Sequence, residues 1–137
     1  MFDTILKGGL VIDGSGQAGF DGDVGIRSGE IVQVGNLARA EAAQIIDVGG
    51  LAVAPGFIDM HTHSDFTLIA DGRAESQVHQ GVTTEVVGQC GISCAPVCTH
   101  KAIASVSPWY TDKARHADWR SFGDYLDALE QTDLGVN

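Results

Sequence analysis

Basic residues are scarce in this chain. Its 137 residues include 8 Lys and Arg against 18 Asp and Glu, which gives a formal net charge of −10. Binding to a nucleic-acid backbone rests on clustered Lys and Arg, so this balance argues against a nucleic-acid partner. A membrane partner is also disfavoured, because no apolar run approaches the roughly 18 residues of a spanning helix and no stretch forms a basic amphipathic surface.

Paired cysteines and a leader sequence are lacking too. The three cysteines, Cys90, Cys94 and Cys98, are an odd number and contain no Cys-x-x-Cys pair. The opening Met1-Phe2-Asp3 shows no basic region before an apolar stretch, as a signal peptide would. Together these features favour a reducing compartment, and we expect a cytoplasmic protein. The cysteine spacing of four suits one helix face, but Pro96 argues against an unbroken helix and a three-cysteine site.

The first part of the sequence, residues 1–54, consists of short apolar or alternating runs separated by glycine-rich turns. Ser28-Gly29 between two such runs predicts a hairpin. We expect a small, incomplete β-sandwich whose six short strands lie at residues 3–6, 10–12, 23–27, 30–34, 45–47 and 51–54. An incomplete sheet exposes unpaired backbone groups, so self-association through exposed edges is also expected.

From residue 55 onward the expected order of elements changes to strand, helix, strand. Strands are predicted at residues 57–61 and 83–87 and a helix at 74–80, which is the order of a parallel α/β unit. An irregular insertion is expected at about 93–120. It is followed by a helix over residues 121–130, which Ser121 can cap. The fold class is therefore α/β, with 1–54 and 55–137 as two domains.

Two histidines two positions apart close the first strand of the second part. Residues i and i+2 of a strand point to the same face, so His61 and His63 can reach one ion. Two histidines are not yet a site, because zinc usually takes three or four protein ligands. Asp59 lies on the same face, where it either orients a liganding histidine or holds the backbone at the strand end. From the residues alone, a metal pair and two surface histidines both remain open.

Three segments resemble the amidohydrolase superfamily. Residues 55–63 read PGFIDMHTH and are similar to the Pro-Gly-Phe-Ile-Asp-x-His-x-His pattern at the end of the superfamily's first barrel strand. Residues 80–93, QGVTTEVVGQCGIS, resemble a segment of the N-acyl-D-amino-acid deacylases (D-aminoacylases). The opening residues 3–14 resemble the family's entry strand. The resemblance covers roughly residues 2–98 and narrows the superfamily to its deacylase branch.

The resemblance implies a zinc site with a division of labour. Cys90 would hold a tightly bound zinc together with histidines from later strands, while His61 and His63 would serve a second, weaker metal position. In a parallel barrel these strand ends meet at one face, so the three side chains can converge. The family's catalytic aspartate would lie beyond Asn137. Ser64 stands where several family members carry an acidic residue, which leaves substrate choice open.

The resemblance also implies a reaction and a longer protein. The reaction is zinc-dependent hydrolysis of a non-peptide C–N bond, with small N-acyl-D-amino acids as substrates. A complete (β/α)8 barrel needs about 250 residues. We therefore expect an N-terminal portion that holds the start of a barrel behind an incomplete sandwich and is inactive alone. Two alternatives stay open: a cyclic-amide hydrolase of dihydroorotase or hydantoinase type, against which Cys90 argues, and a non-catalytic metal-binding or interaction module.

The remaining histidines and aromatic residues are expected to serve structural roles. His79 falls in a predicted helix, and His100 and His116 fall in the irregular insertion. Trp109, Tyr110 and Trp119 are better explained by core or lid packing than by a substrate entrance.

Overall fold

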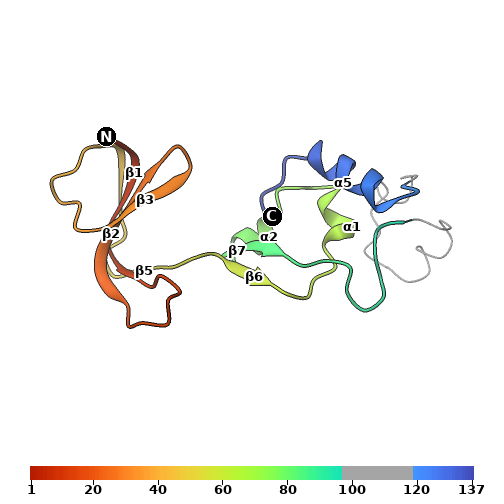
Figure 1. Ribbon diagram of the computed structural model, residues 1–137, viewed down its shortest axis with the longest axis horizontal. Helices are drawn as coiled ribbons and strands as arrows, with labels where there is room; N and C mark the ends of the chain where they lie inside the picture. Colours follow the sequence, from red (N-terminus) through yellow and green to blue (C-terminus); the bar gives the residue numbers. More distant parts are fainter. Residues whose placement is uncertain (97–118) are drawn as a thin grey trace. The chain divides into compact units, whose positions relative to one another are not determined.

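The protein is a mixed α/β structure, as its sequence predicts. The computed structural model describes residues 1–96 and 119–137, which form two compact units, Met1–Pro55 and Gly56–Asn137 (Figure 1). Most of the expected insertion at 93–120 lies outside the described residues. None of the helices that the structure describes has the length and apolar character needed to cross a bilayer.

The first unit is built on one five-stranded sheet. Its strands are β1 (Phe2–Val11), β2 (Phe20–Arg27), β3 (Glu30–Gly35), β4 (Ala42–Asp47) and β5 (Ala52–Val53). They follow the order β3-β2-β1-β4, and β5 also pairs with β1. β2 is antiparallel to its two neighbours, whereas β4 and β5 run parallel to the first and second halves of β1.

One strand-level prediction in this unit is wrong. Residues 3–6 and 10–12 were expected as two strands because Gly8-Gly9 indicates a turn, but both segments belong to β1, which ends at Val11. The chain passes through the glycines with a register shift between Leu6 and Gly9, and Gly8 takes φ +75°. A bulge of this kind needs the left-handed backbone that glycine adopts without steric cost.

The hairpin predicted at Ser28-Gly29 is confirmed. The two residues join β2 to β3 and have φ values of 52° and 79°. Positive φ at both central positions is the signature of a type I′ turn, whose twist matches that of the flanking strands. Arg27 and Glu30 accordingly pair across the turn.

The core of the first unit is small. Phe2, Ile5 and Leu37 form its buried cluster. Buried Asp23 accepts hydrogen bonds from the backbone N–H groups of Gly8 (2.9 Å) and Leu37 (2.8 Å), which tie the bulge to the chain after β3. Large apolar side chains on the sheet stay exposed within the described structure, among them Ile31, Val34, Ile45 and Ile46. The described residues therefore leave part of the sheet's apolar surface uncovered.

The second unit places two short parallel strands among helices. β6 (Phe57–Asp59) pairs with β7 (Val82–Glu85), and between them lie α1 (Asp65–Leu68) and α2 (Glu75–Val78). The predicted strand-helix-strand order is confirmed, but both strands end earlier than expected. The helix predicted at 74–80 is present as the single turn α2. Ala74, which precedes it, has a left-handed backbone, and Gly81 (φ +82°) lies beyond its end. α1 was not predicted.

Backbone hydrogen bonds place the segment 135–137 next to Gly72 and beside β7. The N–H of Gly135 donates to the carbonyl of Gly72 (2.8 Å), and Asn137 then bonds to Thr83 (N–H to O, 2.9 Å) and to Glu85 (O to N–H, 2.9 Å). This alternation is the hydrogen-bond pattern of a parallel ladder. Asn137 therefore extends the β6–β7 sheet on the free edge of β7.

α5 (Phe122–Glu130) contributes Tyr125 to the buried core of the second unit. The predicted cap is confirmed: the Ser121 hydroxyl accepts from the Asp124 N–H (3.2 Å) and the Asp124 carboxylate accepts from the Ser121 N–H (2.8 Å). Tyr125 is buried and Leu129 packs partly against the core, whereas Phe122 and Leu126 are 50% and 44% exposed. The described residues thus cover the apolar side chains of α5 only in part.

Removing the cap should destabilise α5 measurably. We expect Ser121→Ala to cost ~1 kcal/mol of unfolding free energy, because the Asp124 N–H loses its acceptor. Hydrogen bonds from Ser121 hold the pKa of Asp124 below its usual value. The contribution of that carboxylate is therefore present above the usual Asp pKa and lost as pH falls through the lowered one. Denaturant unfolding at neutral and acidic pH measures both effects; Ser76→Ala on α2 is the control and should change stability by less than ~0.5 kcal/mol.

Candidate metal centre

The three predicted ligands lie at the ends of the two parallel strands. His61 and His63 follow β6, and Cys90 follows β7. Backbone bonds from Val86 N–H to the Asp59 carbonyl (2.8 Å) and from Thr62 N–H to the Val86 carbonyl (3.3 Å) hold the two exits together. Because parallel strands end at the same edge of a sheet, residues 29 positions apart meet there.

The structure brings the donor atoms of these residues into one cluster. One ligand atom each from His61, His63 and Cys90 lies within 4.8 Å of the others, a group identified among residues 1–96 and 119–137. His61 Nε2 is 3.1 Å from Cys90 Sγ, and the two imidazole rings meet edge to face with centroids 5.7 Å apart. Bond lengths of 2.0–2.3 Å to tetrahedral zinc correspond to donor separations of about 3.3–3.6 Å. Small adjustments would therefore let all three donors bind one ion, and thiolate with imidazole is a donor set that suits zinc.

The backbone at Cys90 is held in an unusual conformation. Its φ is 56°, in the left-handed region, between Gly88 at φ 80° and Gly91 at φ 69°. A non-glycine residue in this region costs on the order of 1–2 kcal/mol. Such strain is typical of functional sites, where the surrounding structure imposes it. Here it turns the loop so that the exposed thiol faces the histidines.

Asp59 contacts the backbone of the histidine loop. Its Oδ1 accepts a hydrogen bond from the His61 N–H at 3.0 Å. Of the two roles considered for this residue, the observed bond corresponds to holding the chain at the strand end. Direct orientation of a liganding imidazole by Asp59 stays a prediction.

Asp65 is the functional candidate that sequence reasoning missed. Its side chain is 1% exposed, and Oδ2 accepts from the Cys94 N–H at 2.9 Å. Its own carbonyl accepts from the Tyr125 hydroxyl at 3.1 Å. Burial raises the pKa of the Asp65 carboxyl, an effect that the Cys94 N–H and the charge of His63 oppose. The sequence offers no signal of this, because an aspartate at the start of a short helix is usually exposed.

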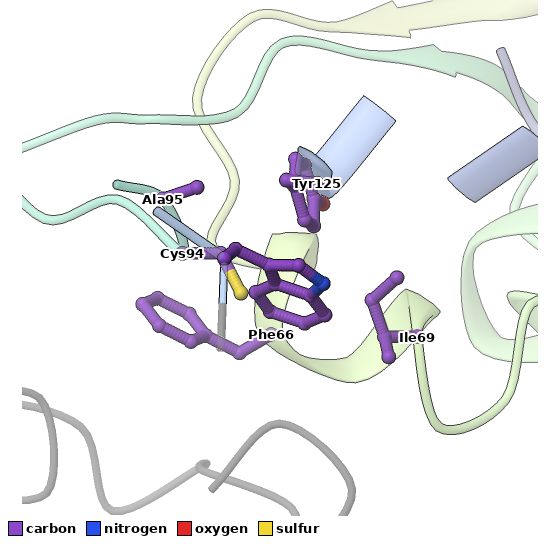
Figure 2. Packing of buried hydrophobic residues seen from close by; sticks show 6 residues of the cluster. Phe66, Ile69, Cys94, Ala95 and Tyr125 are labelled. Atoms are coloured by element: carbon purple, nitrogen blue, oxygen red, sulfur yellow. The ribbon is translucent and has the colours of Figure 1, made fainter. Parts of the chain in front are cut away.

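Cys94 belongs to the core and not to the ligand cluster. It is buried with Phe66, Ile69, Ala95 and Tyr125 (Figure 2) and with Trp119, whose ring is 5.2 Å from that of Tyr125. Burial, with a smaller contribution from Asp65, raises the pKa of the Cys94 thiol to about 12. A thiol that stays protonated at neutral pH is a poor metal ligand. The core packing expected for Trp119 is confirmed.

The other candidates have simple outcomes. His79 follows the last residue of α2, and its Nδ1 lies 2.7 Å from the carbonyl oxygen of Glu75 at the start of that helix, in agreement with a structural role. Ser64 is buried, and its hydroxyl donates to Glu85 Oε2. The side chain at this position is therefore engaged within the unit. The remaining candidates lie outside the described residues: Cys98, His100, Trp109, Tyr110 and His116.

Sequence comparison agrees with this geometry. The sequence profile of the amidohydrolase family matches residues 44–133, a segment that includes all three clustered residues. The chain belongs to the amidohydrolase family. The family resemblance predicted from PGFIDMHTH and from the cysteine segment is thereby confirmed. Within the family, the chain is 43% identical over 136 residues to a D-aminoacylase of Alcaligenes xylosoxydans xylosoxydans, covering 99% of this chain and 28% of that relative.

Solved structures of amidohydrolases resemble the chain over its whole length. One is a D-aminoacylase with a binuclear metal centre (TM-score 0.87, 41% identity), matched over 100% of this chain and 28% of its own. Another is the N-acyl-D-glutamate deacylase of Bordetella bronchiseptica, complexed with zinc and a phosphonate inhibitor (TM-score 0.82, 32% identity, 99% and 28%). The chain thus spans slightly more than a quarter of the length of these proteins.

Proposed function

We propose that the protein carrying this chain is a zinc-dependent amidohydrolase that removes the acyl group from N-acyl-D-amino acids. The observation that carries the proposal is the convergence of the His61, His63 and Cys90 donor atoms within 4.8 Å. It is supported by similarity to a D-aminoacylase and to a deacylase solved with zinc. The products would be a carboxylate and a free D-amino acid.

The residues of this chain would supply part of the metal's ligand set. Cys90 offers an exposed soft donor on a loop with left-handed backbone, and the two imidazoles approach it from the neighbouring strand end. When bound, zinc polarises the amide carbonyl and lowers the pKa of its water to about 7. The chain's own contribution is to hold these donors at one strand edge, with Asp59 fixing the backbone before His61. The base of the reaction is expected from an aspartate beyond Asn137.

We also propose the architecture of the complete protein. The parallel pairing of β6 with β7, and of Asn137 with β7, fits the first strands of a (β/α)8 barrel. The uncovered apolar side chains of the first unit fit a β-sandwich that is completed by further strands. In this proposal residues 1–54 and 55–137 are N-terminal parts of two domains. The described chain alone would then hold an incomplete active site.

Hydrolysis of matched enantiomers tests the proposed activity. The native protein at its natural length, loaded with zinc, should release free amine from N-acetyl-D-amino acids and not from the L-enantiomers. A panel of neutral and acidic side chains would define the substrate, since relatives include N-acyl-D-aspartate and N-acyl-D-glutamate deacylases. A chelator should abolish turnover and added zinc should restore it. Turnover of hydantoin or dihydroorotate instead would favour a cyclic-amide hydrolase, and metal binding without any turnover would favour a non-catalytic module.

A further inference from the structure

We propose that Asp65 is a positioning residue of the metal centre. Its carboxylate accepts a hydrogen bond from the His63 imidazole and so joins the segment that carries His61 and His63 to the loop that carries Cys90. The inference rests on the proposed metal site and adds to it a residue outside the ligand set. The Asp65 carboxylate is buried two residues after His63, and one of its two oxygens accepts a hydrogen bond within the described residues.

The two carboxylate oxygens of Asp65 have different surroundings. Oδ2 accepts from the Cys94 N–H at 2.9 Å, whereas Oδ1 is buried and has no hydrogen-bond partner within residues 1–96 and 119–137. The side chain is 1% exposed, so bulk water cannot compensate for the missing partner. A buried acceptor without a donor costs about 1–3 kcal/mol, and more when it is charged. We therefore expect Oδ1 to accept a hydrogen bond from a side chain of the metal centre.

The imidazole of His63 is the proposed donor. His63 lies two residues before Asp65, in the segment between β6 and α1, and it is half-buried. A histidine that binds a metal through one ring nitrogen almost always donates its other N–H to a carboxylate, a carbonyl or water. Such a bond selects the tautomer and fixes the ring's rotation. In this site it would leave the opposite nitrogen of His63 directed at the ion.

Asp65 is also anchored to the loop that carries the thiol. The N–H that binds Oδ2 belongs to Cys94, four residues after Cys90, and the Tyr125 hydroxyl holds the Asp65 carbonyl from α5. One side chain thereby connects His63 with the Cys90 loop, while its backbone is fixed against the core. Asp59 differs, because its observed bond reaches the backbone of His61. The structure thus gives the two aspartates distinct tasks.

Zinc affinity separates this role from a general structural one. In the native protein at its natural length, Asp65→Asn keeps an oxygen for the Cys94 N–H but loses the anionic acceptor. We expect about 10–100-fold weaker zinc binding in competition with a chromophoric chelator, and altered visible bands of the cobalt-substituted protein. Asp127→Asn removes the same charge from an exposed site of α5 and is the matched control. This control should stay within about twofold of wild type.

The outcomes distinguish the two proposals. If Cys90→Ser bound as much zinc as the wild-type protein, the metal site itself would be contradicted. A metal site intact in wild type with unchanged affinity in Asp65→Asn, or an equal loss in Asp127→Asn, would overturn the positioning role alone. Should Asp65→Asn fail to fold, long-range ¹H–¹⁵N spectra of the zinc-loaded wild type decide the question. They should show His63 with one metal-bound nitrogen and one slowly exchanging N–H, and rapid exchange of that proton would overturn the proposal.

Discussion

Cys90→Ser is expected to lose the tightly bound zinc, with hydrolysis falling at least about 100-fold. When zinc is bound, Cys90 would supply the anionic donor among the three clustered residues, and a serine hydroxyl stays protonated at neutral pH. Serine has nearly the same size and no greater conformational restriction, so the left-handed backbone at this position should persist. Elemental analysis after gel filtration and turnover of N-acetyl-D-amino acids measure the two effects.

Cys94→Ser is the matched control for this substitution. It makes the same atomic change four residues later, in a buried thiol that burial keeps protonated. We expect this variant to lose stability, because a hydroxyl replaces sulfur in the core, and to keep its zinc. Equal zinc loss in both variants would mean that the loop has collapsed, and zinc retention in Cys90→Ser would remove Cys90 from the ligand set.

Gly135→Ala is expected to destabilise the second unit by about 2–4 kcal/mol. A Cβ at this position would collide with the carbonyl oxygen of Arg73 and lie 3.0 Å from its carbonyl carbon. Backbone atoms cannot rotate away as a side chain would, so the two segments must separate. The separation weakens the Gly135–Gly72 hydrogen bond and disturbs buried Val136. Denaturant unfolding of the native protein measures the loss.

Gly123→Ala provides a control for the same change in open surroundings. Gly123 lies in the first turn of α5, and among residues 1–96 and 119–137 the contact found for its Cβ is the Ser121 hydroxyl oxygen, at 3.5 Å. Alanine favours helix by up to ~1 kcal/mol over glycine, so stability should be unchanged or slightly higher. If both variants unfolded at the same denaturant concentration, the close approach at Gly135 would not be an important constraint.

Elements with strong local chemistry were predictable from the sequence. The cap of α5 requires only Ser121 and the carboxylate three residues later, and the β2–β3 turn requires only Ser28-Gly29. β1 was predicted as two strands because Gly8-Gly9 carries a local turn signal. That signal is overridden by parallel pairing with β4 and β5, which involves residues about 40 positions away. Such pairing cannot be deduced from one short window of sequence.

The site was predictable to a similar degree. His61, His63 and Cys90 stand in compact motifs, and the adjacency of two parallel strand ends was enough to bring them together. Asp65 was missed because its burial depends on Cys94 and on Tyr125, the latter 60 residues away. No periodic pattern distinguishes a single buried aspartate from an exposed one at a helix start. Contacts between distant segments, and not the chemistry of the residues themselves, set that limit.

The short stretch of chain that separates the clustered donors has a consequence for biosynthesis. Cys90 follows His61 by only 29 positions, so closing this part of the site costs little chain entropy. At translation rates of about 5–20 residues per second, both ends of that stretch leave the ribosome within about 6 s of each other. Tyr125, which anchors Asp65, follows later. Metal capture on the nascent chain can thus precede the contacts that hold the ligands rigid, so the ion itself would act as an early crosslink in folding.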